Sequence, residues 1–218
     1  MDYSPFFPSA DNLPQKLPIF PLENAVLMPH AELPLNIFEP RYLNMVKDAL
    51  ASHHMFGMVQ PDPAADQASG QVYRAGCAGR ITSYRETADG RILLTLTGVC
   101  RFDIRRELPG KNGYRLVAPD WQRFLPDLQH AVDDDFPERR SLLRLLSGYL
   151  HARGLQVDWE FLETLTTLQL VHSMTVLLPI EPAEKQAILE SVEASARLHA
   201  FQSALQCSFD GRTGKSRH

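Results

Sequence analysis

LPIFPLENAVLMPHAELPLNIFEPRYLNMVKDAL, residues 17–50, is the stretch that decides the fold of this chain. It contains three short apolar runs, at 17–20, 25–28 and 33–38, and each run is bounded by a proline or by the pair Glu23–Asn24. A helix start follows at Glu39–Pro40, because proline suits the first helical position, where its missing N–H would have no partner anyway. The stretch therefore predicts short strands that turn at prolines and then lead into a helix.

The predicted helix is amphipathic. One of its sides is polar, with Arg41 and Lys47 among its residues. The other side is an apolar stripe whose members recur at helical spacing: Tyr42, Met45, Val46, Ala49 and Leu50. We expect this stripe to pack across the strands.

A β-hairpin is the clearest local signal farther along the chain. After a return strand at 53–59 and a polar loop at 61–70, extended runs at 72–87 and 91–105 meet at Asp89–Gly90, two residues that accept positive φ. In the second run the even-numbered residues are apolar or glycine, whereas Arg101 and most other odd-numbered residues are polar, which predicts one buried and one wetter face. A two-residue turn would pair Ile81 with Gly98.

The same register places small residues opposite large ones, as a curved, closed sheet requires. It pairs Cys77 with Phe102 and Gly79 with Cys100. A second turn at 109–113 and a closing strand at 114–118 would complete about six or seven strands. The pattern predicts an antiparallel barrel or sandwich with one helix across it.

Residues 136–207 predict helices only. A helix at 136–153 should end at Gly154 in the left-handed conformation, and Asp158 can cap the next helix. A third, at 167–178, stops at Pro179. Glu181–Pro182 repeats the helix-start arrangement, and the last helix should continue to about residue 207.

The segments outside these elements are interpreted from their composition. Prolines in 1–16 predict an irregular arm, which its Phe6–Phe7 pair either packs onto the domain or extends to a neighbouring molecule. In the connector 121–135 the aromatic residues should pack back onto the sheet while the acidic run stays in water. Asp135 can cap the helix that follows.

Composition excludes several classes of protein. The chain has 218 residues, 44% hydrophobic and 22% charged, which is typical of a soluble globular protein. A net charge of −4 argues against extensive phosphate binding. The first residues, MDYSPFFPSADN, lack a secretory signal pattern, and no apolar run is long enough to cross a membrane, so we expect a cytoplasmic protein.

No motif predicts catalytic, metal-binding or cofactor-binding residues. The GRTGKS string at 211–216 resembles a phosphate loop, but Phe209 stands where that loop needs glycine. The eight histidines form no H-x-x-x-H pattern, and Ser147 lies in a leucine-rich helix without a nucleophile elbow. Three cysteines cannot all pair; Cys77 and Cys100 would be diagonal neighbours beyond disulfide reach, so we expect core thiols.

An ordered series of motifs resembles the N-terminal domain of the ATP-dependent Lon protease. It comprises LPIFPL, LMPHAELPLNIFEPRY and a helix ending in DAL, followed by CAGRITSYRETADGRILLTLTGVCRF and by LPIEPAEKQAILE. These motifs cover most of residues 17–207. The resemblance implies an α+β fold, with a PUA-like antiparallel β-barrel and one crossing helix followed by an all-helical bundle.

We therefore expect the following order of parts: a proline-rich arm (1–16), a PUA-like β-domain (17–120), a linker (121–135), a helical bundle (136–208) and a flexible tail (209–218). In the Lon family the ATPase and the serine–lysine pair that cuts peptides each lie on another domain. No residues of this chain match either of them. The resemblance implies a stand-alone, non-catalytic module that recognises polypeptides.

The implied ligands are unfolded or extended polypeptides, and the Lon protease itself is a candidate partner. Apolar residues near prolines, and the helix start, are the candidate binding residues: Met28, Pro29, Leu33, Pro34, Glu39, Arg41 and Tyr42. A purely structural role for the last three, pinning the helix to the sheet, is the alternative. An open strand edge could also pair with a peptide backbone.

Two other functions stay open. PUA-like barrels elsewhere bind RNA, and arginines are frequent on the hairpin, although acidic residues are interspersed: Arg80, Arg85, Arg91, Arg101, Arg105 and Arg106. A hydrolase with paired carboxylates would need a pocket that holds two close acids, at least one with a raised pKa.

Overall fold

The protein is described by a computed structural model that covers residues 8–65, 70–129 and 136–213, without the side chains of 208–213. The chain divides into two compact units, Met1–His130 and Ala131–His218, which we call the sheet unit and the helical unit. The pair Phe6–Phe7 and Asp135 lie outside the described residues. Within the described ranges no helix has both the length and the apolar character to cross a membrane.

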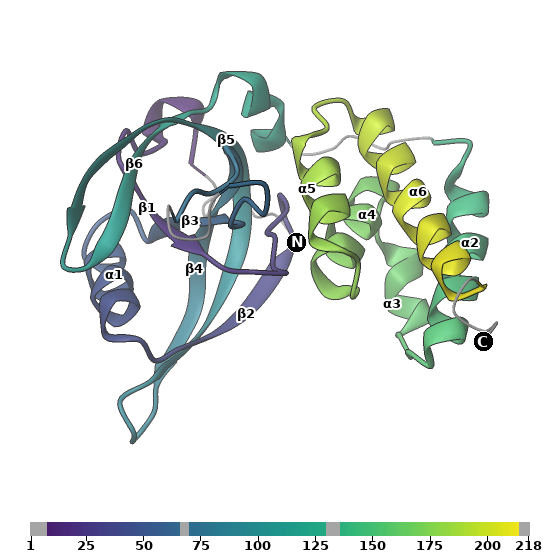
Figure 1. The fold of residues 1–218 in the computed structure, drawn as a ribbon, viewed down its shortest axis with the longest axis horizontal. Coiled ribbons are helices and arrows are strands. Elements are labelled where there is room, and N and C mark those ends of the chain that lie inside the picture. Colours follow the sequence, from purple (N-terminus) through teal and green to yellow (C-terminus); the bar gives the residue numbers. More distant parts are fainter. Residues whose placement is uncertain (1–7, 66–69, 130–135, 214–218) are drawn as a thin grey trace. The chain divides into compact units, whose positions relative to one another are not determined.

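The sheet unit is built on six strands (Figure 1). Their spatial order is β2-β5-β4-β3-β1-β6, and a further pairing of β5 with β6 closes the circuit from β5 through β4, β3, β1 and β6. Strand β2 lies beside the first half of β5. The strands are β1 (Leu17–Pro21), β2 (Glu32–Ile37), β3 (Met55–Val59), β4 (Ala75–Glu86), β5 (Ile92–Lys111) and β6 (Tyr114–Asp120).

The prediction of an antiparallel sheet is wrong for one pair of strands. Strand β1 pairs with β3 in parallel, with Ile19 opposite Gly57. The chain between these strands passes through β2 and a helix, and such a crossover is what a parallel pair needs. The sheet is therefore mixed, and the α+β class that we expected is confirmed.

The register predicted for the β4–β5 hairpin is also wrong. Thr87 N donates to Arg91 O (2.9 Å) and Gly90 N donates to Thr87 O (2.9 Å), so the loop has three residues instead of two. Gly90 has φ +83°, whereas Asp89 is not in the left-handed region that a type I′ turn requires of both its central residues.

Two irregularities in the pairing of β4 with β5 change the register further. They lie between Ala78 and Gly79 and between Ile81 and Ser83, so that Ile81 faces Leu96 and Gly79 faces Gly98. Cys77 faces Arg101, and Cys100 faces Ala78. The expectation that both cysteines are free, buried thiols is confirmed.

The second turn is shorter than the predicted 109–113. Strand β5 continues to Lys111, which pairs with Tyr114 across Asn112–Gly113. Both turn residues have positive φ, +50° and +87°, as a two-residue hairpin turn prefers. The Asn–Gly dipeptide was therefore the better sequence signal.

The apolar run 25–28 is not a strand. Asn24 and His30 have positive φ on either side of it, which interrupts extended backbone. Its residues Val26, Leu27 and Met28 are nevertheless buried. The run packs onto β5 at Gly98, where an added Cβ would lie 2.0 Å from the carbonyl oxygen of Met28.

Helix α1 (Pro40–Leu50) follows the prediction. Tyr42, Met45, Val46 and Ala49 are buried on one stripe. A polar cluster ties the opposite side to the β5–β6 turn, because Asp48 Oδ2 accepts from Tyr114 Oη (2.7 Å) and lies 3.0 Å from Lys111 Nζ.

Among the residues that the structure describes, two 3-10 helices flank the strands of the sheet unit. The first, η1 (Ala10–Asn12), lies in the stretch that we expected to be irregular. The second, η3 (Gln122–Leu128), lies in the expected linker and buries Phe124. The Trp121 ring contacts Phe102 edge-on, with centroids 5.7 Å apart, so the aromatic residues of this connector do pack back onto the sheet.

The helical unit contains α2 (Arg139–Arg153), α3 (Trp159–Thr164), α4 (Thr167–Leu177), α5 (Pro182–Glu190) and α6 (Ala194–Thr213). The left-handed stop at Gly154 (φ +65°) and the cap at Asp158, which accepts from Phe161 N (3.1 Å), are confirmed.

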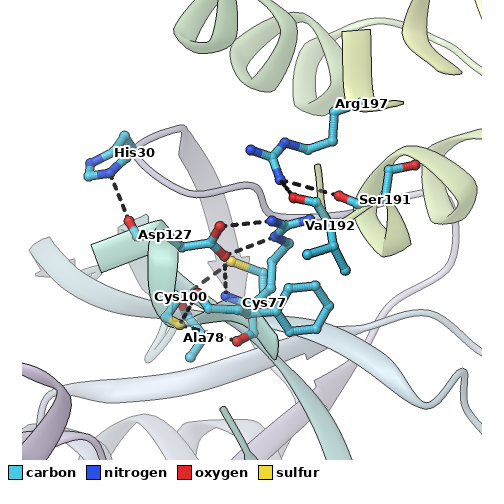
Figure 2. Close-up of polar contacts among 10 residues, drawn as sticks. His30, Cys77, Ala78, Cys100, Asp127, Ser191, Val192 and Arg197 are labelled. Carbon is cyan, nitrogen blue, oxygen red and sulfur yellow. Dashed lines mark hydrogen bonds and ion pairs between the residues drawn. The ribbon is translucent and has the colours of Figure 1, made fainter. Parts of the chain in front are cut away.

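The continuous last helix that we expected is broken at 191–193. Arg197 Nη1 donates to the carbonyl oxygens of Ser191 (3.2 Å) and Val192 (2.6 Å), which satisfies acceptors at the end of α5 (Figure 2). Helix α6 also continues into the stretch expected to be a tail, since no proline stops it before Thr213.

Candidate functional site

Strand β2 borders one side of the sheet. In the described part of the chain it pairs with β5 and with no other strand. Cross-strand partners share a face, so Leu33 and Leu35 lie on the same face as the buried Leu96 and Leu94. Of the predicted binding residues, Leu33 is half-buried here, whereas Pro34 is exposed on the opposite face.

A groove lies where β5 runs between β2 and β4. Its volume is ≈ 490 Å³. We call it the β5 groove, and its lining consists of Pro34, Leu35, Asn36, Ser83, Tyr84, Arg85, Leu93, Leu94 and Thr95. All of the lining side chains other than Arg85 are uncharged, and Pro34, Leu35, Leu93 and Leu94 are apolar, so the groove suits a largely apolar ligand better than a polyanion.

Two exposed aromatic residues belong to this region, Tyr84 in the lining of the groove and Phe38 directly after β2, and sequence reasoning had not assigned either to the site. Phe38 is 60% exposed at the end of β2, and Tyr84 is 55% exposed on β4. The guanidinium of Arg91 lies 5.9 Å from the centroid of the Phe38 ring. The sequence signal for Phe38 was the alternation along this stretch. Pro34 and Asn36, four and two positions earlier, are exposed as well.

Met28 and Pro29 are placed differently from the other candidates. Both are buried, and Met28 has no exposed surface. Their position follows from Gly98, whose missing side chain lets the Met28 backbone lie directly on β5. A ligand could touch Met28 only after this segment had moved.

Glu39, Arg41 and Tyr42 form a local cluster at the start of α1. Arg41 Nε donates to Glu39 Oε2 (2.9 Å), and the guanidinium lies 4.5 Å from the centroid of the Tyr42 ring. The Tyr42 ring packs on the Phe20 ring, with centroids 4.2 Å apart. Burial is the main reason that the pKa of Tyr42 is raised. These contacts support the pinning role for this cluster.

Asp48 continues the attachment of α1 to the β5–β6 turn. The hydrogen bond from Tyr114 is the largest reason that the pKa of Asp48 is lowered, followed by the one from Lys111. The pKa of Tyr114 is raised, first by burial and then by its bond to Asp48. The opposite shifts are what a phenol that donates to a carboxylate should show.

A buried ion pair joins β5 to η3, and sequence reasoning missed it. Asp127 accepts three bonds from Arg101, at 2.9 Å from Nε, 2.8 Å from Nη2 and 3.0 Å from the backbone N. The ring nitrogen Nε2 of His30 lies 3.2 Å from the backbone oxygen of the same aspartate (Figure 2). Arg101 was expected on the wetter face, but Asp127 and the Phe124 ring, 4.5 Å away, enclose it.

The two buried thiols lie next to this pair (Figure 2). Cys100 Sγ donates to Phe124 O (3.3 Å), and Cys77 Sγ donates to Ala78 O (3.6 Å). Burial raises the pKa of both thiols, and the charge of Asp127 raises both pKa values further. They are packing residues, because a nucleophilic cysteine needs a lowered pKa.

A larger hollow of ≈ 870 Å³ lies along the segment 8–16. Its lining is mostly polar, and it includes Asn12, Lys16, His53 and Arg80. None of the predicted binding residues lines it. The β5 groove is therefore the stronger candidate for an apolar polypeptide.

Part of the positive charge of the surface arginines is offset by acidic residues. Several of these arginines pair with an acidic neighbour: Arg91 with Asp89 (2.8 Å), Arg115 with Glu107 (2.7 Å) and Arg123 with Asp103 (2.6 Å). Within the described ranges no group of three His, Cys, Asp or Glu residues could hold a metal ion.

Comparison with known proteins gives a consistent result. The family model of the ATP-dependent protease La (LON) substrate-binding domain matches residues 16–206. Lon protease 2 of Myxococcus xanthus is 28% identical over 204 residues, covering 86% of this chain and 23% of that protein. Lon protease of Dictyoglomus thermophilum is 30% identical over 194 residues, covering 86% and 24%. The chain thus spans about a quarter of the length of these relatives.

Two solved structures are similar over most of their length. The Lon N-terminal domain protein from Xanthomonas campestris has a TM-score of 0.63 and 25% identity, covering 86% of this chain and 97% of that one. The N-terminal domain of Mycobacterium avium complex Lon protease has a TM-score of 0.60 and 17% identity, covering 88% and 98%. The latter similarity shows the fold alone.

Proposed function

The chain belongs to the family of LON substrate-binding domains, and we propose that it binds unfolded or extended polypeptide segments without catalysing a reaction on them. The resemblance noted in the sequence and the family match support the same function. The observation in the structure that carries the proposal is the β5 groove, whose lining includes the exposed Tyr84, together with the exposed Phe38 directly after β2.

This surface has the chemistry that an unfolded polypeptide requires. Aromatic side chains supply much of the binding free energy at protein interfaces, because they bury a large area at a low cost in conformational entropy. Unfolded chains expose apolar side chains that folded proteins bury. Phe38 and Tyr84 would contact these side chains, and the other residues of the β5 groove would contact the rest of the segment.

The alternative functions receive less support. RNA binding would use the hairpin arginines, but Arg101 is buried on Asp127 and Arg91 pairs with Asp89. A carboxylate hydrolase would need two close acids in a pocket, and the carboxyl with a raised pKa among the described residues is Glu184, which does not line the β5 groove. We therefore propose binding alone.

The Lon protease is the partner that the family match suggests. The relatives that match this chain are Lon proteases, and the match covers about a quarter of each. We propose that the chain presents bound polypeptides either to such a protease or independently of it, in the cytoplasm.

Fluorescence anisotropy with an unfolded probe tests the proposal. The probe is a fluorescein-labelled protein that has been reduced and carboxymethylated so that it cannot refold. We expect the chain to bind it and Phe38→Ser to weaken binding by roughly tenfold, because Phe38 would be a central aromatic contact. Tyr84→Ser should weaken binding by a smaller factor.

The helical unit offers matched controls. Leu177 is 62% exposed and Phe161 is 58% exposed, close to the values of Phe38 and Tyr84. Leu177→Ser and Phe161→Ser should leave the affinity unchanged, and circular dichroism should show that all four variants are folded. If the probe does not bind, or if the control variants weaken binding as much as Phe38→Ser, the proposal is wrong.

A further inference from the structure

The hydrogen-bond pattern of β5 determines which backbone groups of β2 are unpaired. Thr87 N donates to Arg91 O, so along residues 92–97, the part of β5 that pairs with β2, the odd-numbered residues direct their backbone groups toward β4. The even-numbered residues then face β2, in agreement with the bond from Gly98 N to Ala31 O (2.9 Å). Since even residues of β5 pair with odd residues of β2, the even residues of β2 direct their backbone groups to the open side: Glu32, Pro34 and Asn36.

Pro34 fits this assignment. Proline has no N–H to give to a sheet ladder and is therefore found on edge strands with its nitrogen facing away from the sheet. The open edge consequently offers N–H donors at Glu32 and Asn36, and carbonyl acceptors at all three positions. The missing donor also limits indiscriminate pairing, which an uninterrupted edge would invite.

The side chains along the edge specify what kind of segment would fit. On one face Leu33 and Leu35 are half-buried beside the buried Leu96 and Leu94, so an added strand with apolar side chains at alternate positions would cover them. On the other face Glu32 is exposed and has no ion-pair partner within the described ranges. A basic residue opposite it would complement its charge.

We propose that the open edge of β2 pairs with an extended polypeptide segment whose side chains alternate between apolar and polar, with a basic residue opposite Glu32. The inference rests on the proposed function and specifies its ligand. The bound segment forms a further strand beside β2, and recognition depends mainly on its backbone, so that many sequences are accepted.

Backbone methylation of a peptide probe tests the pairing directly. The probe is a fluorescein-labelled peptide of eight residues in which leucine alternates with threonine, with lysine replacing one threonine. Two further peptides carry N-methyl groups on alternate residues, one on the odd and the other on the even positions. Side chains are the same in all three, but only one methylated peptide loses the N–H groups that would face β2. We expect one methylated peptide to lose binding and the other to retain it.

Variants of the edge give a second measurement. Pro34→Ala adds an N–H donor to the open side and should tighten binding of the unmethylated peptide roughly two- to tenfold, the effect of one hydrogen bond. Pro109→Ala, which changes an exposed proline on β5 away from this edge, should have no effect. Glu32→Lys should weaken binding of the lysine peptide and tighten binding of a peptide with glutamate in its place.

The outcomes separate this inference from the proposed function. If the unfolded protein probe binds but both methylated peptides bind equally, or both fail, strand pairing is wrong while polypeptide binding stands. If the unfolded protein probe does not bind, the proposed function and the strand-pairing inference are both wrong. Sedimentation of the unliganded chain as a dimer that Pro34→Ala tightens would assign the edge to a second copy of the chain, and would overturn the proposal.

Discussion

The two units of this chain are stabilised in different ways. In the sheet unit the contacts join residues that are far apart in sequence: Leu17 pairs with Val117, and Arg101 binds Asp127. In the helical unit many polar contacts are local, such as the capping box of Thr166 and Gln169 and the cap of Asp158 on Phe161. A few are longer in sequence, such as the bond from Tyr149 Oη to Pro179 O (3.2 Å). The sheet unit contains a buried ion pair, whereas no ion pair is found among the described residues of the helical unit. The comparison implies that loss of one partner of this pair can decide the stability of the sheet unit, whereas the helical unit sums smaller contributions.

Each unit contains one of the two tryptophans, which allows them to be measured separately. Trp121 packs on Phe102 in the sheet unit, and Trp159 lies on α3 in the helical unit. In a Trp159→Phe background, fluorescence reports unfolding of the sheet unit. In a Trp121→Phe background it reports unfolding of the helical unit.

The largest effect is expected for Asp127→Ala. It leaves the guanidinium of Arg101 buried without its partner carboxylate, which costs about 3–5 kcal/mol. Urea unfolding should show this loss in the Trp121 signal and a much smaller change in the Trp159 signal. An equal loss in both signals would show that the two units unfold together, and the comparison would fail.

Two controls separate the buried charge from charge pairs in general. Glu107→Gln breaks the exposed pair with Arg115 and should cost less than about 1 kcal/mol. The double variant Arg101→Met with Asp127→Leu removes both charges and should recover most of the stability lost in Asp127→Ala. Stability as low as that of Asp127→Ala would mean that the packing, and not the unpaired charge, is at fault.

Gly98→Ala should have the next largest effect. The added Cβ would lie 2.0 Å from the carbonyl oxygen of Met28, so the buried segment 25–31 must move, at a cost of about 1–3 kcal/mol to the sheet unit. Gly148→Ala, at an exposed position inside α2, should instead stabilise the helical unit by up to about 1 kcal/mol. Measuring both by urea unfolding tests whether a glycine is required for close packing or is only tolerated.

A local cap in the helical unit should matter less. Thr166→Ala removes the acceptor for Gln169 N at the start of α4 and should cost about 1 kcal/mol. Thr164→Ala removes only a hydroxyl that donates to Phe161 O on the surface, and should change stability by less than about 0.5 kcal/mol. A Thr166→Ala loss as large as that of Asp127→Ala would contradict the distinction between the units.

The same difference explains which features the sequence could predict. Helix starts at Pro40 and Pro182, the stop at Gly154 and the cap at Asp158 depend on neighbouring residues, and their signals lie within a few positions. The break at Ser191 was missed because Arg197 satisfies its carbonyl from the next helix.

Features of the sheet unit were harder to predict because they depend on distant partners. The register of β4 depends on two bulges that no local residue signals, and the burial of Arg101 depends on Asp127 in the connector. For the proposed binding surface, the candidates Leu33 and Pro34 lie on β2 at the open edge, whereas Phe38 and Tyr84 emerge only when the faces of the sheet are known.

The smallest effect expected is a dependence on pH with opposite signs in the two units. The hydrogen bond from Tyr114 is the main cause that lowers the pKa of Asp48 in the sheet unit. A carboxyl with a lowered pKa stabilises the fold above its unfolded-state pKa, and the contribution is lost as the pH falls through the folded-state value. Burial is the main cause that raises the pKa of Glu184 in the helical unit, so its contribution is present below the unfolded-state pKa and lost as the pH rises through the folded-state value.

Acidification from neutral pH toward about pH 4 should therefore add stability to the helical unit through Glu184, while the sheet unit loses stability through Asp48 only at about pH 4 and below. Glu184→Gln should flatten the pH dependence of the Trp159 signal between pH 7 and 4 and leave that of the Trp121 signal unchanged. Asp48→Asn should reduce the acid loss in the Trp121 signal. Thermal unfolding across this range, at constant ionic strength, measures both slopes. Slopes of the same sign in the two units would place the acid response in their exposed carboxyls instead of in these two groups.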